Sequence, residues 1–168
     1  MSVSRRGFLR GRFRAEAQVL RPPWALAPEL FESRCTRCGE CLTVCPTGIL
    51  VAGPGGFPTV DFGRGECNFC GDCVSACRPR ALERGAGEAR PWLLKAAIGD
   101  NCLARRGVEC RVCGELCEAA AIRFRPTAGG VAQPVFDAAR CSGCGACHAP
   151  CPVGAIAITK ETESQACR

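Results

Sequence analysis

The sequence predicts an α+β fold built from two small modules in tandem, each made of short β-hairpins and short helices. Cysteine is unusually abundant, with 17 among 168 residues, and sixteen of these lie in four short runs. A glycine-rich turn between two apolar segments follows the first run and returns after the third. Equivalent cysteines are 32 residues apart in the first pair of runs (Cys38 and Cys70) and 31 apart in the second (Cys113 and Cys144). This repetition indicates an internal duplication.

Three of the four runs have the spacing C-x₂-C-x₂-C-x₃-C. The spacing is typical of [4Fe–4S] clusters, because three thiolates of one run bind one cluster and the fourth binds its neighbour. Small residues such as Gly39, Gly71 and Gly143 allow backbone N–H groups to point at sulfur atoms. We therefore predict the architecture of bacterial two-cluster ferredoxins, with four [4Fe–4S] clusters per chain. The predicted iron ligands are Cys35, Cys38, Cys41, Cys45, Cys67, Cys70, Cys73, Cys77, Cys102, Cys110, Cys113, Cys117, Cys141, Cys144, Cys147 and Cys151.

Zinc and disulfides are the alternatives for so many cysteines. A tetrahedral zinc site needs two C-x₂-C pairs, or one pair with histidines, so the third cysteine of each run would have no role. The chain has a single histidine, His148, so mixed cysteine and histidine zinc modules are excluded. His148 lies within the fourth run, which already supplies four thiolates, so it is not needed as a ligand. Disulfides are disfavoured because cysteines in adjacent C-x₂-C units are poorly placed to bridge each other, and their total is odd.

The third run departs from the common spacing. Seven residues separate Cys102 from Cys110, where two are expected. A longer loop adds little closure entropy, so Cys102 is still predicted to be a ligand. Its competitor is Cys167, near the end of the chain.

The fourth cysteine of each run is expected to bind the cluster of a neighbouring run, as in two-cluster ferredoxins. Pairing the first run with the fourth, and the second with the third, remains open, but the short hairpins favour neighbours. The favoured ligand sets are Cys35, Cys38, Cys41 with Cys77; Cys67, Cys70, Cys73 with Cys45; Cys102, Cys110, Cys113 with Cys151; and Cys141, Cys144, Cys147 with Cys117.

Short elements are expected around these runs. The composition predicts a helical turn over 28–33, a short helix over 39–45 and hairpins over 49–61 and 121–137. Pro91 before a run of Leu, Lys and Ala predicts a helix over 91–98. The predicted organisation is a basic arm and extended segment (1–30), a first two-cluster module (31–83), a linker (84–101), a second two-cluster module (102–160) and a tail (161–168).

The formal net charge of +6 is concentrated at the N-terminus, where residues 1–21 hold six arginines and one glutamate. An oxidised cluster with four thiolates carries about −2, so four clusters would bring the remaining chain to about −7. An acidic body and the lack of an aromatic and basic platform argue against a nucleic-acid partner. No run of eighteen apolar residues occurs, so no transmembrane segment is expected.

The N-terminal arm begins Ser4-Arg5-Arg6-Gly7-Phe8-Leu9-Arg10, which looks like a twin-arginine export motif. Export also needs an uncharged apolar stretch, whereas Arg12 and Arg14 interrupt this one. Assembly of clusters needs reduced thiols, and both arguments favour a cytoplasmic protein. As a short basic amphipathic helix, the arm could strap onto its own protein, dock on a partner protein or lie on a membrane surface.

Together these features resemble the NapF family, ferredoxin-type accessory proteins encoded with periplasmic nitrate reductases. The resemblance rests on the arginine-rich start, Arg21-Pro22-Pro23-Trp24, the four cysteine runs and the widened third run. It implies a cytoplasmic protein that meets the precursor of the molybdenum-containing catalytic subunit before export and helps its maturation.

Two function classes remain, the first of them implied by the resemblance. One is a maturation factor that supplies electrons or a cluster to an enzyme precursor. The other is an electron-transfer subunit of a membrane-associated respiratory or hydrogenase-type complex. In both, another redox protein serves as electron donor. The sequence has no nucleotide, flavin or substrate motif, so we expect no catalytic residues and no enzyme activity.

Overall fold

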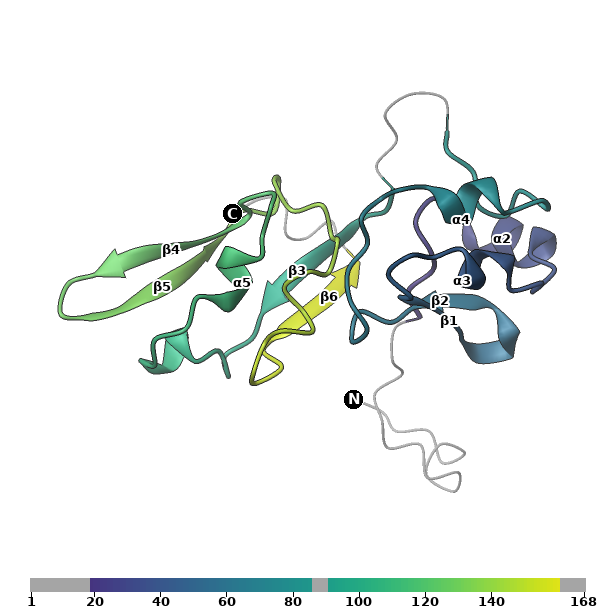
Figure 1. Ribbon diagram of the computed structural model, residues 1–168. Coiled ribbons are helices and arrows are strands. Elements are labelled where there is room, and N and C mark those ends of the chain that lie inside the picture. The colour runs from purple at the N-terminus through teal and green to yellow at the C-terminus, as the bar shows by residue number, and fades with distance from the viewer. Residues whose placement is uncertain (1–18, 86–90, 161–168) are drawn as a thin grey trace, which may run out of the picture.

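A computed structural model describes residues 19–85 and 91–160 (Figure 1). The arm helix, the tail and Cys167 lie outside these residues, so the expectations for them stay predictions. Two lobes lie side by side, and each corresponds to one cysteine-rich half of the sequence (Figure 1). None of the described helices is long and apolar enough to cross a membrane.

The first lobe contains three short α-helices, one short 3₁₀ element (η1) and one hairpin. Proline in the first turn starts α2, and Phe31 of this helix is fully buried. The hairpin pairs β1 with β2 in antiparallel register, with Leu50 opposite Val60. The predicted helical turn, short helix and first hairpin are thus confirmed. The elements are α2 (Pro28–Arg34), α3 (Glu40–Thr43), β1 (Leu50–Ala52), η1 (Pro54–Gly56), β2 (Pro58–Val60) and α4 (Asp72–Ser75).

The second lobe contains two antiparallel strand pairs. The predicted second hairpin is confirmed as β4 with β5, in which Ile122 lies opposite Phe136. The other pair joins β3 to β6, with Lys95 opposite Thr159 and Ile98 opposite Ile156. The elements are β3 (Leu94–Ile98), η2 (Ala104–Arg106), α5 (Val112–Glu115), β4 (Ile122–Thr127), β5 (Gly130–Phe136) and β6 (Ile156–Lys160).

The expectation of a helix over 91–98 was wrong, because residues 94–98 form strand β3. Leu, Lys and Ala favour a helix, but local propensity is readily overridden by tertiary pairing. Leu94 and Ala96 are each 4% exposed, and β3 shares backbone hydrogen bonds with the last strand of the lobe. Part of the expected linker therefore belongs to the sheet of the second lobe.

The two lobes share one hydrophobic core, which includes Phe31 and Phe62 from the first and Ile122 from the second. Trp92 lies at the joint between them. Its ring makes edge-on contacts with Phe62 and Phe69, at centroid distances of 5.7 and 5.8 Å. Its indole N–H donates to the carbonyl of Ser142 at 3.1 Å. The joint is therefore a packed interface and fixes the two cysteine-rich lobes against each other.

Candidate metal centres

Four hollows in the two lobes are each lined by four cysteines. Three come from one run, and the fourth is the last cysteine of the other run in the same lobe. The four groupings coincide with the neighbour pairing expected from the sequence. The groups are Cys35, Cys38, Cys41 and Cys77; Cys67, Cys70, Cys73 and Cys45; Cys102, Cys110, Cys113 and Cys151; and Cys141, Cys144, Cys147 and Cys117.

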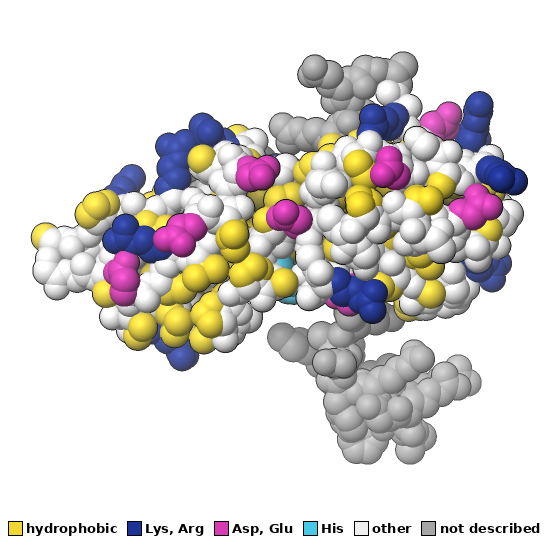
Figure 2. Space-filling view, in the orientation of Figure 1, with side chains coloured by type: hydrophobic (Ala, Val, Ile, Leu, Met, Phe, Trp, Pro, Cys, Tyr) yellow, Lys and Arg dark blue, Asp and Glu magenta, His cyan; other side chains and the backbone are white. Residues whose placement is uncertain are grey.

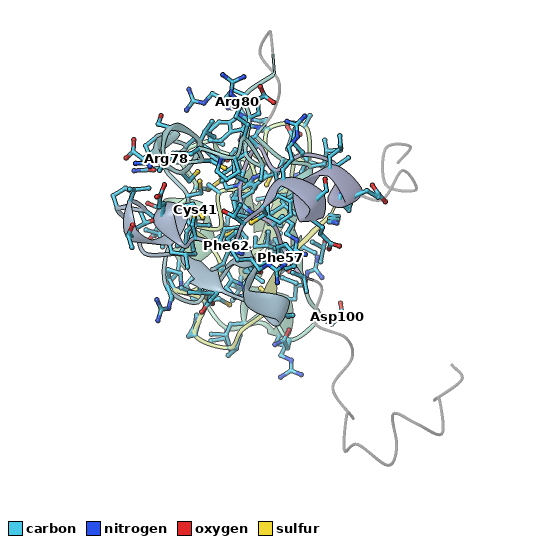
Figure 3. The ribbon with its side chains drawn as sticks, turned by 90° about the vertical axis from the view of Figure 1, so that its right-hand side faces the viewer. Cys41, Phe57, Phe62, Arg78, Arg80 and Asp100 are labelled. Carbon is cyan, nitrogen blue, oxygen red and sulfur yellow. The ribbon has the colours of Figure 1, made fainter. Side chains whose placement is uncertain are left out.

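The hollows are alike in size, with empty volumes of about 310–360 Å³, part of which opens to solvent. No group of three or more Cys, His, Asp or Glu in the described ranges is arranged to hold a single metal ion. Figure 3 shows Cys41 inside its lobe, whereas Arg78 and Arg80 lie at the edge. This donor set, four cysteines spread around a hollow, suits a multinuclear cluster better than one zinc ion.

The backbone of the runs turns the cysteines toward these hollows. In the first run Arg37 (φ 60°) and Gly39 (φ 79°) flank Cys38 in the left-handed region. The second run repeats this with Phe69 and Gly71, and the fourth with Gly143 and Gly145. Left-handed backbone is unusual for a bulky residue such as Phe69, so its recurrence at equivalent sites indicates a geometry required by the loop.

The last cysteine of each run accepts hydrogen bonds at its sulfur. Backbone N–H groups donate to Cys77 Sγ from Leu82 (3.4 Å), to Cys117 Sγ from Ala121 (3.3 Å) and to Cys151 Sγ from Ala155 (3.1 Å). Such bonds stabilise thiolate sulfur and are one of the ways in which proteins tune iron–sulfur clusters.

Cys45, the last cysteine of the first run, also has a hydrogen-bonding group beside its sulfur: the Thr47 hydroxyl lies 3.5 Å from its Sγ. Burial disfavours the thiolate, but hydrogen bonds from the Thr47 hydroxyl and from backbone groups of residues 47, 49 and 50 outweigh it and lower the pKa of Cys45. Thr47 is a contributor to the site that the cysteine spacing did not reveal.

Five other cysteines resist ionisation. Burial, reinforced by neighbouring thiols, raises the pKa of Cys41 and Cys147 to about 12. Burial likewise raises the pKa of Cys67, Cys73 and Cys113 to about 11. These side chains are neutral thiols at pH 7 without a cation, so metal binding must displace their protons.

Cys102 lies at one of the hollows, whereas His148 does not. Cys102 is 8% exposed and lines the third hollow despite the seven-residue insertion. His148 lines none of the four hollows. Its Nδ1 lies 2.7 Å from the carbonyl oxygen of Ile156, and donation to that oxygen holds the ring against β6.

Two lobes that each hold a pair of cysteine-lined hollows define a tandem two-cluster iron–sulfur protein. A family model described as "4Fe-4S dicluster domain" matches residues 34–81 and 107–155. The chain is 47% identical to the ferredoxin-type protein NapF of Escherichia coli (strain K12), over 93% of this chain and 94% of the relative. It is 48% identical to the protein of the same name from Haemophilus influenzae, over 94% of each chain.

A more distant relative is the methylamine utilization ferredoxin-type protein MauM of Methylobacillus flagellatus, with 34% identity over 94% of this chain and 74% of the relative. The chain thus belongs to the family of NapF ferredoxin-type proteins, as its arginine-rich start and cysteine runs indicated.

Proposed function

We propose that this protein binds four [4Fe–4S] clusters and carries electrons to a client enzyme. The four cysteine groups around the hollows are the ligand sets, and each bound cluster supplies a one-electron redox centre. The observation that carries the proposal is that all four hollows have the same cysteine lining, including the one formed by the irregular third run.

The four hollows form a row, and the two inner hollows are those lined by three cysteines of the second run and three of the fourth run. Across the joint, the backbone N–H of Cys67 donates to the carbonyl of Cys144 at 2.8 Å. Within the first lobe, Cys73 of the second run is close enough to Cys41 of the first run to help raise its pKa. Within the second lobe, Cys113 of the third run does the same to Cys147 of the fourth run. The order is therefore first, second, fourth and third run. In this arrangement an electron enters at one outer cluster and leaves at the other.

As a member of the NapF family, the protein is proposed to act in the cytoplasm on the precursor of the periplasmic nitrate reductase catalytic subunit. There it assists maturation by supplying electrons or a cluster, with another redox protein as donor. It is a carrier and not an enzyme. On the described part of one face, acidic and basic side chains are interspersed without a continuous basic stripe (Figure 2), which suits a protein client better than a nucleic acid.

A permanent electron-transfer subunit of a respiratory or hydrogenase-type complex is the second candidate, favoured by the row of four hollows. Affinity purification of the native protein, with and without the molybdenum enzyme in the cell, separates the two. A maturation factor is found mostly free and is transiently enriched with the precursor. A fixed ratio to a membrane-associated complex would instead support the second candidate.

The cluster count is directly measurable. Anaerobically purified or reconstituted protein is expected to contain about sixteen irons and about sixteen sulfides per chain, since each cube holds about four of each. About eight of each would show that only one lobe is loaded. Zinc at about one ion per hollow would overturn the iron–sulfur proposal.

The arm provides a second test in this system. Replacing Arg5, Arg6, Arg10 and Arg12 by Gln is expected to weaken client binding without changing iron content, because none of these residues is a proposed ligand. Raised salt should weaken binding of the unmodified protein, since exposed charges are screened over about 8 Å at physiological ionic strength. Unchanged client binding together with lost iron or thermal stability would show that the arm is a strap on its own protein.

A further inference from the structure

Lys95 is the one polar or charged residue with a buried side chain among residues 19–85 and 91–160, at 6% exposure. It lies on β3, and its Nζ donates to two carbonyl oxygens, those of Ala138 and Cys141, each at 2.7 Å. Both acceptors belong to the segment that opens the fourth cysteine run. The ammonium is therefore held against the backbone of one candidate cluster site.

A buried cation is costly unless a negative charge compensates it. None of the ion pairs formed by the described residues involves Lys95, and its two acceptors are neutral. Lysine is also rare here, because Lys95 and Lys160 are the only lysines in a chain with 22 Lys and Arg residues. Cys141, whose carbonyl oxygen accepts from Lys95 Nζ, also lines the hollow of the fourth run. Lys95 itself does not line the hollow, so its ammonium approaches the site from behind the backbone of Cys141. A cluster bound there would supply the missing negative charge.

The first lobe has no equivalent cation at this position. Leu82 lies five residues after Cys77, and Ile156 lies five residues after Cys151. Leu82 bridges to Ala25, as Ile156 pairs with Ile98. Pro22 lies three residues before Ala25, and Lys95 lies three residues before Ile98. Pro22 is therefore the residue of the first lobe that is equivalent to Lys95.

The second run is instead approached by Arg84, which donates to the carbonyl of Cys70 at 3.1 Å but is exposed. Solvent screens an exposed charge far more than a buried one. The internal cation thus distinguishes the fourth run from its duplicate.

We propose that Lys95 is the internal counter-ion of the cluster held by Cys117, Cys141, Cys144 and Cys147, and that it raises the reduction potential of this cluster above those of the other three. The inference rests on the proposed four-cluster function. A cluster with four thiolates goes from about −2 to about −3 when it takes up one electron, so a fixed positive charge stabilises the reduced form. Because this site is an inner member of the row, electrons from a low-potential redox protein collect inside the protein before they pass to the client.

The test is an EPR-monitored redox titration of the full chain, reconstituted anaerobically and reduced with dithionite. The variants are Lys95→Gln, which removes the charge and keeps an N–H donor, Lys95→Arg, which keeps the charge, and Lys160→Gln as control. Lys160 is an exposed residue of β6, the strand that pairs with β3. It therefore tests loss of a lysine from the same sheet without loss of a buried charge.

In Lys95→Gln the highest-potential cluster is expected to show a ratio of reduced to oxidised form about tenfold lower at a fixed potential, or about 59 mV for a one-electron couple. The other three clusters of Lys95→Gln are expected to keep their original potentials. In Lys95→Arg and Lys160→Gln, all four clusters are expected to keep them. Loss of iron from Lys95→Gln, with full iron in Lys95→Arg, also supports the counter-ion role, because arginine shares the charge.

Four unchanged potentials in a fully loaded Lys95→Gln protein would overturn the inference and leave the four-cluster proposal intact. Iron far below about sixteen per chain in the unmodified protein would instead show that the four-cluster proposal itself fails.

Discussion

Removal of iron is expected to unfold both lobes of the protein. The regular elements are very short, with three to seven residues each, and cysteines of all four runs belong to the shared core or pack against it. Without metal, the four hollows lose the group that ties their walls together. Small domains that cannot bury enough apolar area commonly depend on such metal centres, and their binding free energy is then folding free energy.

The experiment is anaerobic treatment with an iron chelator, followed by near-UV circular dichroism and thermal melting. The loaded protein should melt cooperatively, and the stripped protein should show no cooperative transition. Addition of iron and sulfide to the stripped sample should restore the transition, and addition of sulfide alone is the control. A stripped protein that still melts cooperatively would show that the apolar core suffices and that the clusters are not structural.

Local features of this fold could be predicted from the sequence because they are encoded by adjacent residues. The left-handed glycines Gly39 and Gly71 lie within the cysteine runs that need them, and Pro28 marks the start of α2. The two hairpins are closed by short glycine-containing turns, so their register is also local. The cysteine spacing, together with the pairing known for two-cluster ferredoxins, led to the same four groups that line the hollows.

The features that the sequence did not reveal depend on distant residues. β3 is a strand because residues 156–160 lie beside it, about sixty positions later in the chain. A local pattern of Leu, Lys and Ala cannot report that partner. Trp92 belongs to the joint only because Phe62, Phe69 and Ser142 converge on it. The burial of Lys95 follows from the same pairing, and its only sequence signal was the rarity of lysine.

The widened third run gives the second large prediction. Replacing Cys102 by Ser or Ala is expected to lower iron content from about sixteen to about twelve per chain, because one cluster loses a ligand. Cys102 is buried, and it packs in a small apolar cluster with Ala104 and Ala155. The second lobe should therefore melt at a lower temperature as well.

Cys167→Ser is the matched control, since it removes a thiol near the chain end and none of the sixteen proposed ligands. Iron content, sulfide content and the melting profile of each lobe should be measured for both variants. Normal iron in Cys102→Ser and Cys102→Ala, with reduced iron in Cys167→Ser, would transfer the ligand assignment to Cys167. Loss of iron only in the Cys102 variants would show that a seven-residue insertion still returns a cysteine to its cluster, as the small closure entropy of a longer loop allows.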